Sequence, residues 1–339
     1  MIRTAIQKTV DKQHLSREEA FHAMEAIMKG EATDAQIGAL LISLRMKGEQ
    51  PQEIAGFAES MRKNARPVPL PLSLDAVDLV GTGGDGKHTF NISTVASFVV
   101  AGAGVPVAKH GNRSVSSKCG SADVLKALGI HIDIDANQMG QCLEKVGIAF
   151  LFAPVLHPAM KHAIGPRREI GVRSVFNILG PITNPAGVRR QLIGVYERSL
   201  TTLLAEVLRQ LGSRHVLLVH SADGMDEISL AGKTHVVELC DGQIRGYDID
   251  AASFGLTSSA DGIGGGDAAE NAAIAREILG GNPGPAREVV IANAAAGLYV
   301  ADAAPDLKAA AAMATESIDS GAALKKLEDL RRCTGMFLN

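Results

Sequence analysis

A glycine-rich stretch, DLVGTGGDGKHTFNIST (residues 78–94), carries the clearest chemical signal in the sequence. It follows a short apolar run, and Gly81, Gly83 and Gly84 stand within four residues. Glycines let backbone N–H groups converge on an anion, and a following helix N-terminus adds partial positive charge. The stretch matches neither G-x-G-x-x-G nor G-x-x-x-x-G-K-[ST]. We interpret it as a phosphate- or pyrophosphate-binding loop; a tight strand-to-helix turn is the alternative.

A second polar stretch, KHGNRSVSSKCGSAD (residues 109–123), follows the next apolar run. Its basic side chains and four serines precede a single acidic residue, Asp123, whereas an ordinary solvated loop mixes both charges. In parallel α/β sheets, ligands bind beyond the carboxyl ends of the strands. We therefore expect this loop to face the same anion as the first, with Lys109 as the main cation. His110 is placed to orient a substrate or to act as a hydrogen-bonded structural histidine.

A third candidate is the pair Asp226–Glu227, in a turn after the apolar run HVLLVH (215–220). Adjacent carboxylates beside a polyphosphate are suitable ligands for Mg²⁺, which prefers oxygen donors. A solvated turn is the equally simple alternative. A second glycine-rich stretch, GIGGGD (262–267), follows polar residues rather than an apolar run, and we interpret it as a flexible connector.

The first 65 residues have the pattern of helices. Ser16 with Glu19 and Thr33 with Gln36 are capping-box pairs, and each precedes apolar residues at helical spacing. Pro51 suits the first turn of a further helix. The proline-rich stretch RPVPLPLSLD (66–75) then predicts an extended linker and a domain boundary.

After Asp75, short β-branched runs alternate with alanine-rich helical ones, which predicts an α/β domain with a mostly parallel sheet. Asp241–Gly242 predicts the turn of a β-hairpin. Residues 153–187 lack a clear strand and resemble the helical part in pattern. We therefore expect a small all-helical domain (1–70, with a returning segment at about 155–187) and a larger α/β domain (72–154 and 188–339).

Composition narrows the class of protein. The formal net charge is −3 and the isoelectric point about 6.4, which disfavours a nucleic-acid or membrane surface. Four scattered cysteines form no C-x-x-C pair and suit reduced thiols. Neither a secretory signal nor a run of about 20 apolar residues occurs, so we expect a soluble cytoplasmic protein.

Five motifs together resemble the anthranilate phosphoribosyltransferase family: GTGGD, NIST, KHGNRSVSSKCGSAD, RREIGVRSVFNILGPITNP and DGMDE occur here in that family's order. The resemblance extends over nearly the whole chain. It implies a nucleoside phosphorylase/phosphoribosyltransferase-like fold and transfer of a phosphoribosyl group from phosphoribosyl diphosphate (PRPP) to anthranilate, in tryptophan biosynthesis. It also implies a Mg²⁺ cofactor and a homodimer formed through the helical part.

The resemblance implies a role for each matching residue. Lys109 and His110 would be catalytic. PRPP would be bound by Gly81, Gly84, Asp85, Thr89, Asn91, Ile92, Ser93, Thr94, Lys109, Gly111, Asn112, Arg113, Ser114, Ser116, Ser117 and Ser121. Anthranilate would contact Gly81, Asn112 and Arg167, and Mg²⁺ would be held by Ser93, Asp226 and Glu227. Two rival hypotheses are a pyrimidine nucleoside phosphorylase-like enzyme and an inactive paralogue that binds nucleic acid. The Asp226–Glu227 pair argues against the first, and the isoelectric point against the second.

Overall fold

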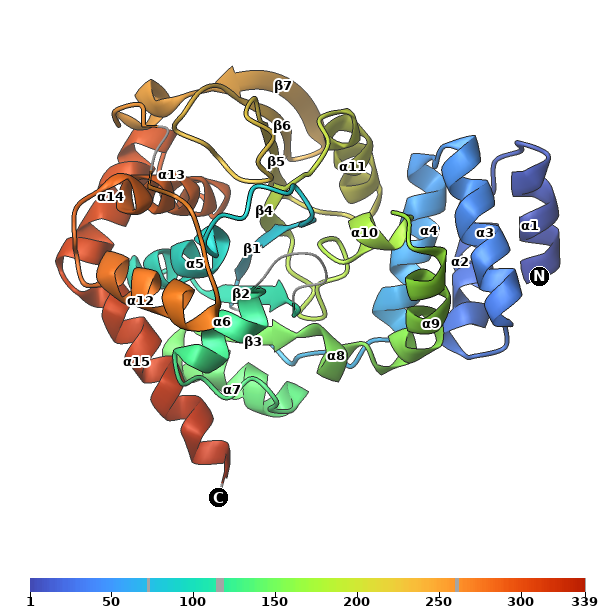
Figure 1. The fold of residues 1–339 in the computed structure, drawn as a ribbon, viewed down its shortest axis with the longest axis horizontal. Coiled ribbons are helices and arrows are strands. Elements are labelled where there is room, and N and C mark those ends of the chain that lie inside the picture. The colour runs from blue at the N-terminus through green and yellow to red at the C-terminus, as the bar shows by residue number, and fades with distance from the viewer. Residues whose placement is uncertain (72–73, 114–118, 260–261, 339) are drawn as a thin grey trace.

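The computed structural model describes residues 1–71, 74–113, 119–259 and 262–338 (Figure 1). Its strands are β1 (Val77–Gly81), β2 (Val107–Gly111), β3 (Ile148–Phe152), β4 (Arg190–Gly194), β5 (His215–Ser221), β6 (Thr234–Cys240) and β7 (Gln243–Ile249). They form one sheet in the order β3-β2-β1-β4-β5-β6-β7. The strands β1 to β5 are parallel, and β6 and β7 are antiparallel to their neighbours. The expected mostly parallel sheet is confirmed.

The strand order reverses between β1 and β4. The chain passes from β1 through β2 to the edge strand β3, and then returns to β4 on the other side of β1. In open α/β sheets, the loops that leave the two strands at such a switch point diverge, and ligands bind in the crevice between them. The glycine-rich stretch leaves the carboxyl end of β1 and therefore begins at this crevice.

Four helices precede the sheet: α1 (Ile2–Val10), α2 (Arg17–Met28), α3 (Asp34–Lys47) and α4 (Pro51–Lys63). Both predicted capping boxes are confirmed, at Ser16 before α2 and at Thr33 before α3. The helix α2 packs along α4, and α1 packs along α3. The apolar faces enclose a core that includes Met24, Ile27, Leu40, Ile54 and Phe57.

Residues 153–187 return to these helices. They form α8 (Ala153–Leu156), the 3-10 turn η1 (Pro158–Met160), α9 (Lys161–Ile170) and α10 (Phe176–Leu179), without a strand in this fully described stretch. The helix α9 packs on α2 and α3 (Figure 1). The Arg62 guanidinium on α4 donates a hydrogen bond of 2.7 Å to the Ile182 carbonyl. The boundaries proposed for the two domains stay a prediction.

The remaining helices cover the sheet. They are α5 (Ile92–Gly102), α6 (Ser121–Ala127), α7 (Ala136–Val146), α11 (Ser199–Gln210), η2 (Ala251–Phe254), α12 (Ala268–Leu279), α13 (Pro285–Val300), α14 (Leu307–Asp319), α15 (Ala322–Gly335) and η3 (Met336–Leu338). The helices α5 and α13 pack on β1, whereas α11 packs on β5, β6 and α4. One apolar cluster accordingly joins Phe57 of the N-terminal helices to Leu204 of α11 and Leu218 of β5. The N-terminal helices thus share a core with one face of the sheet.

Two local predictions have clear outcomes. The hairpin turn at Asp241–Gly242 is confirmed: it joins β6 to β7, and both residues have positive φ (45° and 83°), as a tight hairpin requires. The connector interpretation of 262–267 is wrong for its central part. Thr89 forms a β-bridge with Gly264, the Phe90 N–H donates to the Ile263 carbonyl, and the Gly265 N–H donates to the His88 carbonyl. In the described part of the chain, no helix is long and apolar enough to cross a membrane.

Candidate active site

The glycine-rich loop, residues 82–91 between β1 and α5, has a conformation that depends on its glycines. Gly83, Gly84 and Gly86 have φ of 67°, 77° and 74°, a left-handed region that costs other residues free energy. The start of the loop is fixed on β4, because the Thr82 N–H donates to the Gly194 carbonyl (2.9 Å) and the Thr82 hydroxyl accepts from the Tyr196 N–H (2.9 Å).

Three consecutive amides of this loop are available to a ligand. The N–H groups of Gly84, Asp85 and Gly86 have no acceptor among the residues that the structure describes. Gly84 and Gly86 are exposed. Unpaired N–H groups on a left-handed turn are a common anion-binding arrangement. The first amides of α5 are different, since those of Ile92 and Thr94 donate within the chain.

Two glycines make room for the carboxylate pair. Gly81 and Gly194 are direct neighbours at the carboxyl ends of β1 and β4. A Cβ on Gly194 would lie 1.5 Å from the Asp226 carbonyl oxygen, and one on Gly81 would lie 2.8 Å from Asp226 Oδ2. Glycine at 194 therefore lets the turn after β5 lie across these strand ends, and glycine at 81 leaves room for the Asp226 carboxylate.

The carboxylate pair contacts the glycine loop directly. Asp226 Oδ2 accepts a hydrogen bond of 2.7 Å from the Gly83 N–H, and Glu227 Oε1 accepts one of 3.2 Å from the Ser93 N–H. The next peptide is held by Asn293 on α13, which exchanges two 3.0 Å hydrogen bonds with the Ile228 backbone. The structure thus brings together two separate predicted segments, and it adds Asn293, which the sequence analysis did not single out.

Burial and mutual repulsion perturb these carboxyl groups. Burial, followed by the charge of Asp85, raises the pKa of Asp226 to about 7. Burial, followed by the charge of Asp226, raises the pKa of Glu227 to about 8. Without a cation beside them, both carboxyl groups therefore keep their protons to a higher pH than exposed carboxyl groups do. Together with the Ser93 hydroxyl, their oxygen donors fit a hard divalent cation such as Mg²⁺.

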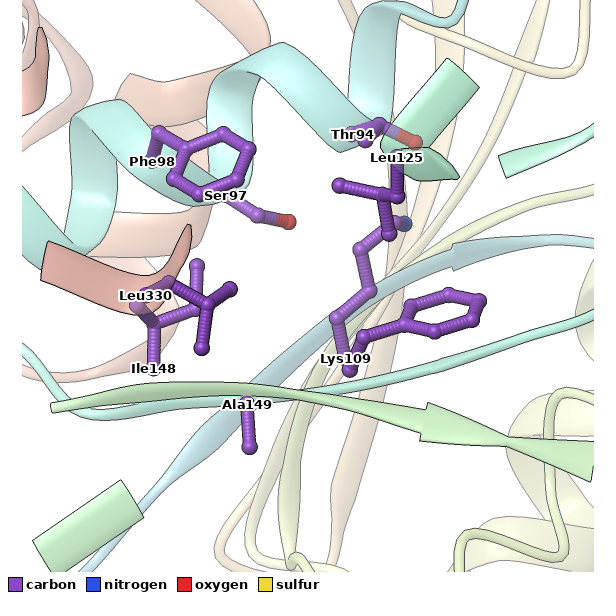
Figure 2. A pocket seen from close by; sticks show the side chains of 9 residues that line it. Thr94, Ser97, Phe98, Lys109, Leu125, Ile148, Ala149 and Leu330 are labelled. Atoms are coloured by element: carbon purple, nitrogen blue, oxygen red, sulfur yellow. The ribbon is translucent and has the colours of Figure 1, made fainter. Parts of the chain in front are cut away.

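Lys109 on β2 lies in the interior beneath this cluster. Its Nζ donates to the Leu79 carbonyl and to Ser93 Oγ (3.3 Å), and burial lowers its pKa. Figure 2 shows its side chain rising toward Thr94 beside a cavity of about 10 Å³. The Thr94 hydroxyl is buried without a hydrogen-bond partner in the described part of the chain. This cavity holds one water at most and is too small for a substrate.

Asp78 on β1 is a buried polar residue that the sequence analysis did not single out. Its Oδ1 accepts from the His110 N–H (3.1 Å) and its Oδ2 accepts from Asn184 Nδ2 (2.8 Å). Burial raises its pKa to about 6, against the opposing charge of Lys109. It ties β1 to β2 and to the end of the returning segment. The available signal was a carboxylate inside the apolar run AVDLV.

His110 is a neutral, buried imidazole. Burial, together with the neighbouring His157, lowers its pKa to about 3, and burial lowers that of His157 to about 4. Nδ1 of His110 lies 3.1 Å from the Gly180 carbonyl, which requires the proton on Nδ1. Nε2 is then an acceptor, and it has no partner among the described residues. At neutral pH His110 is therefore uncharged and cannot act as a cationic general acid.

The loop after β2 is described only at its two ends. Ser114, Ser116 and Ser117 lie outside the described residues. At the start, the Asn112 carbonyl accepts from the Ser121 hydroxyl (3.1 Å), and the Arg113 guanidinium lies 5.8 Å from the centre of the Phe152 ring. At the other end, Asn91 Nδ2 donates to the Cys119 carbonyl (3.3 Å). The two loops therefore lie beside each other.

Arg167 on α9 is not joined to the glycine loop by a hydrogen bond. Its guanidinium lies 4.9 Å from the centre of the Phe176 ring, and it has no hydrogen-bond partner in the described ranges. The predicted site residues are therefore not all connected to one another. Gly81, Ser93, Lys109, Asp226 and Glu227 form a connected group, whereas Arg167 stands apart on the returning segment.

A second cluster of possible metal ligands lies at the opposite end of the strands. The side chains of His215, Glu238 and Cys240 come within 4.8 Å of one another. However, His215 Nε2 and Nδ1 already contact Glu238 Oε1 (2.9 Å) and Asp302 Oδ1 (3.2 Å). Arg245 and the Tyr247 hydroxyl donate to Glu238 Oε2. We interpret this cluster as a structural ion-pair network.

Comparison with known proteins identifies the family. Residues 3–65 match the helical bundle domain of a glycosyl transferase family, and residues 73–324 match the α/β domain of that family. The chain is 56% identical to an anthranilate phosphoribosyltransferase from Moorella thermoacetica over 97% of both chains. It is 52% identical to one from Thermomicrobium roseum over 98% of this chain and 96% of the relative. The chain belongs to the anthranilate phosphoribosyltransferase family.

Solved structures of this family share the fold. The anthranilate phosphoribosyltransferase from Thermus thermophilus has a TM-score of 0.93 and 42% identity, with 97% of this chain and 99% of that one covered. The enzyme from Saccharomyces cerevisiae in complex with PRPP and Mg has a TM-score of 0.90 and 27% identity, with 99% and 98% covered. The helical bundle and the α/β sheet are thus features of the anthranilate phosphoribosyltransferase family.

Proposed function

We propose that the protein transfers the phosphoribosyl group of PRPP to the amino nitrogen of anthranilate, with release of pyrophosphate. The observation that carries this proposal is the cluster at the switch point between β1 and β4. There, three unpaired loop amides (Gly84, Asp85 and Gly86) lie beside the carboxylates Asp226 and Glu227. Amides suit a diphosphate, and the carboxylates suit the divalent cation that accompanies it.

The residues would divide the chemistry between them. The loop amides would hold the diphosphate and stabilise the charge that it gains as the bond to the ribose anomeric carbon breaks. Ser93, Asp226 and Glu227 would hold Mg²⁺, which as a Lewis acid would stabilise the departing pyrophosphate. Lys109 would add positive charge from beneath the site, where its Nζ contacts Ser93 Oγ.

Anthranilate would lie toward the returning segment. The Arg167 guanidinium has no hydrogen-bond partner among the described residues, so it is available for a bidentate pair with the anthranilate carboxylate. Asn112, which is exposed at the end of β2, would contact the same substrate. The aryl amine is a neutral nucleophile, so positioning it in line with the anomeric carbon is the main requirement.

The assembly and location that we propose follow the family resemblance. Four exposed apolar side chains belong to helices of one group or directly follow them: Val10 on α1, Met46 on α3, Ile164 on α9 and Val172 after α9. The helix α3 packs against both α1 and α9. We propose that a second copy of the chain covers this surface, giving a homodimer, and that the enzyme acts in the cytoplasm.

Anthranilate fluorescence provides the test. When the purified protein is mixed with PRPP, Mg²⁺ and anthranilate, the anthranilate fluorescence should decrease and pyrophosphate should be released. Arg167→Ala should raise the KM for anthranilate by about 10- to 100-fold, because a charge-assisted pair contributes roughly 1.5–3 kcal/mol. The KM for PRPP should stay within about two-fold, since no phosphate contact is removed.

Arg168→Ala is the matched control, because Arg168 is an exposed neighbour on the same helix. It should leave both KM values unchanged. Absence of phosphoribosylanthranilate, together with phosphorolysis of uridine or thymidine, would instead favour the nucleoside phosphorylase-like alternative. A shift of labelled DNA in an electrophoretic assay, without either activity, would favour the nucleic-acid-binding paralogue.

A further inference from the structure

Arg173, in the turn between α9 and α10, connects three parts of the molecule. Its backbone carbonyl accepts a hydrogen bond of 2.6 Å from Arg45 Nη1 on α3. Its guanidinium donates to the carbonyl of Gly84 in the glycine loop. The same guanidinium lies 4.0 Å from the centre of the Tyr196 ring, just beyond β4. No role was assigned to this residue from the sequence motifs.

The two side-chain contacts of Arg173, with Gly84 and Tyr196, lie in the same part of the site. The Tyr196 backbone N–H donates to the Thr82 hydroxyl, so the residue that carries the ring is joined to the start of the glycine loop. A planar guanidinium stacked on an aromatic ring has a fixed direction for its donors. The Tyr196 ring therefore orients the guanidinium N–H donors of Arg173 toward the Gly84 carbonyl. A Cβ on Gly84 would lie 3.3 Å from Arg173 Nη2, which leaves little space for a side chain here.

The contact fixes the orientation of the peptide that follows Gly84. The carbonyl of Gly84 and the N–H of Asp85 belong to the same planar trans peptide, and they point in opposite directions. Gly83, Gly84 and Gly86 all have left-handed φ, and glycine moves readily between backbone regions. Without an external contact, this peptide could therefore rotate. With the carbonyl held by Arg173, the Asp85 N–H faces away from Arg173.

The same peptide also carries the Asp85 side chain. Asp85 Oδ2 accepts a hydrogen bond of 3.4 Å from the Asp226 N–H. The orientation of the peptide thus affects both a phosphate-facing amide and a carboxylate beside the proposed Mg²⁺ ligands. The Arg45 side chain on α3 donates to the Arg173 carbonyl, and Arg173 in turn contacts the glycine loop. The N-terminal helices are therefore connected to this loop through Arg173.

We propose that Arg173 is a positioning residue for the diphosphate of PRPP: with its guanidinium against the Tyr196 ring, it holds the Gly84 carbonyl and so aims the Asp85 N–H at the ligand. The proposal rests on the proposed function, since it concerns the same loop. Arg173 acts through the loop in this account and makes no contact with the substrate.

The test compares Arg173→Ala, Arg173→Lys and the control Arg168→Ala by initial-rate kinetics. Arg173→Ala should raise the KM for PRPP by about ten-fold, the change that follows from roughly one lost hydrogen bond of a charged donor. The KM for anthranilate should stay within about two-fold. Arg173→Lys should behave like the alanine variant, because lysine keeps the charge but loses the planar stack on Tyr196.

A fluorescent reporter gives a second readout. The chain contains no tryptophan, so Tyr196→Trp introduces a single one against the Arg173 guanidinium. PRPP with Mg²⁺ should change its emission at a lower concentration when Arg173 is present than in the Arg173→Ala background. Circular dichroism and the thermal midpoint should be the same in all variants.

Three outcomes would overturn the proposal. An unchanged KM for PRPP in Arg173→Ala would show that the loop needs no such contact. Near-normal kinetics in Arg173→Lys would show that the charge itself meets the phosphate. A parallel loss of kcat with a lowered thermal midpoint would show a purely structural role. A wild-type protein that binds PRPP but forms no phosphoribosylanthranilate would instead contradict the proposed function, and the fluorescence titration would still test Arg173.

Discussion

Replacing Asp226 with asparagine should stabilise the metal-free protein while it weakens PRPP binding. Asp226 is 8% exposed, and its pKa is raised to about 7 by burial and by Asp85. Asparagine has nearly the same shape, and its side-chain oxygen can still accept the hydrogen bond from the Gly83 N–H. The substitution therefore removes a charge and keeps the contact.

The size of the effect depends on pH. Between pH values near 4 and 7, the folded state keeps a proton that the unfolded state has released, so stability falls as the pH rises through this range and stays low above it. One pKa unit corresponds to about 1.4 kcal/mol, so the raised pKa of Asp226 lowers the stability by on the order of 4 kcal/mol at pH 8 and by roughly 1–2 kcal/mol at pH 5. Asp226→Asn should recover much of this cost, and more of it at pH 8.

Urea unfolding of EDTA-treated protein at the two pH values measures this directly. Asp223→Asn is the matched control, because Asp223 is an exposed carboxylate on the same turn. In kinetic assays, Asp226→Asn should raise the KM for PRPP by at least about ten-fold, since a Mg²⁺ ligand is lost. A variant that is destabilised by equal amounts at pH 5 and pH 8 would refute the reasoning, because Asp226 would then be an ordinary structural acceptor.

Two further predictions concern the rest of the molecule. Glu238 is fully buried, and hydrogen bonds from His215, Tyr247 and Arg245 outweigh burial and lower its pKa from 4.5 to about 2. The contribution of the Glu238 carboxylate to stability is therefore present above about pH 4.5 and is lost as the pH falls toward 2. In urea unfolding, Glu238→Gln should cost on the order of 3 kcal/mol at pH 7 and much less at pH 3. An equal cost at both pH values would contradict this prediction. Met46 is 82% exposed on α3 and belongs to the surface that we propose as the dimer interface. In sedimentation velocity, Met46→Asp should therefore convert a dimer to a monomer, whereas Met336→Asp, at the other end of the chain, should not. A monomeric wild-type protein would disprove the proposed interface.

Local signals predicted much of the fold. The capping boxes at Ser16 and Thr33 and the turn at Asp241–Gly242 act over a few residues, so their sequence patterns are sufficient. The alternation of short apolar runs with helical ones likewise predicted the mostly parallel sheet. The strand order could not be derived in this way, because the position of β4 beside β1 depends on contacts between residues more than 100 positions apart.

The site was predicted in its parts but not in its assembly. The glycine loop and the carboxylate pair were recognisable, yet the hydrogen bond between Gly83 and Asp226 spans 143 residues. Gly194 gave no signal, since a glycine at the end of a strand is common, and its function is to leave space for the Asp226 backbone. The connector interpretation of 262–267 was wrong for a related reason. Gly265 faces the backbone of Thr89 and Phe90, and close backbone contact leaves no side-chain pattern in the sequence.

A crystal structure with PRPP and Mg²⁺ bound would test the central claim most directly. We expect the diphosphate oxygens within about 3 Å of the N–H groups of Gly84, Asp85 and Gly86, the usual hydrogen-bond distance. We also expect the metal beside Asp226 and Glu227. PRPP bound in another part of the molecule, with these three amides still without an acceptor, would contradict the account.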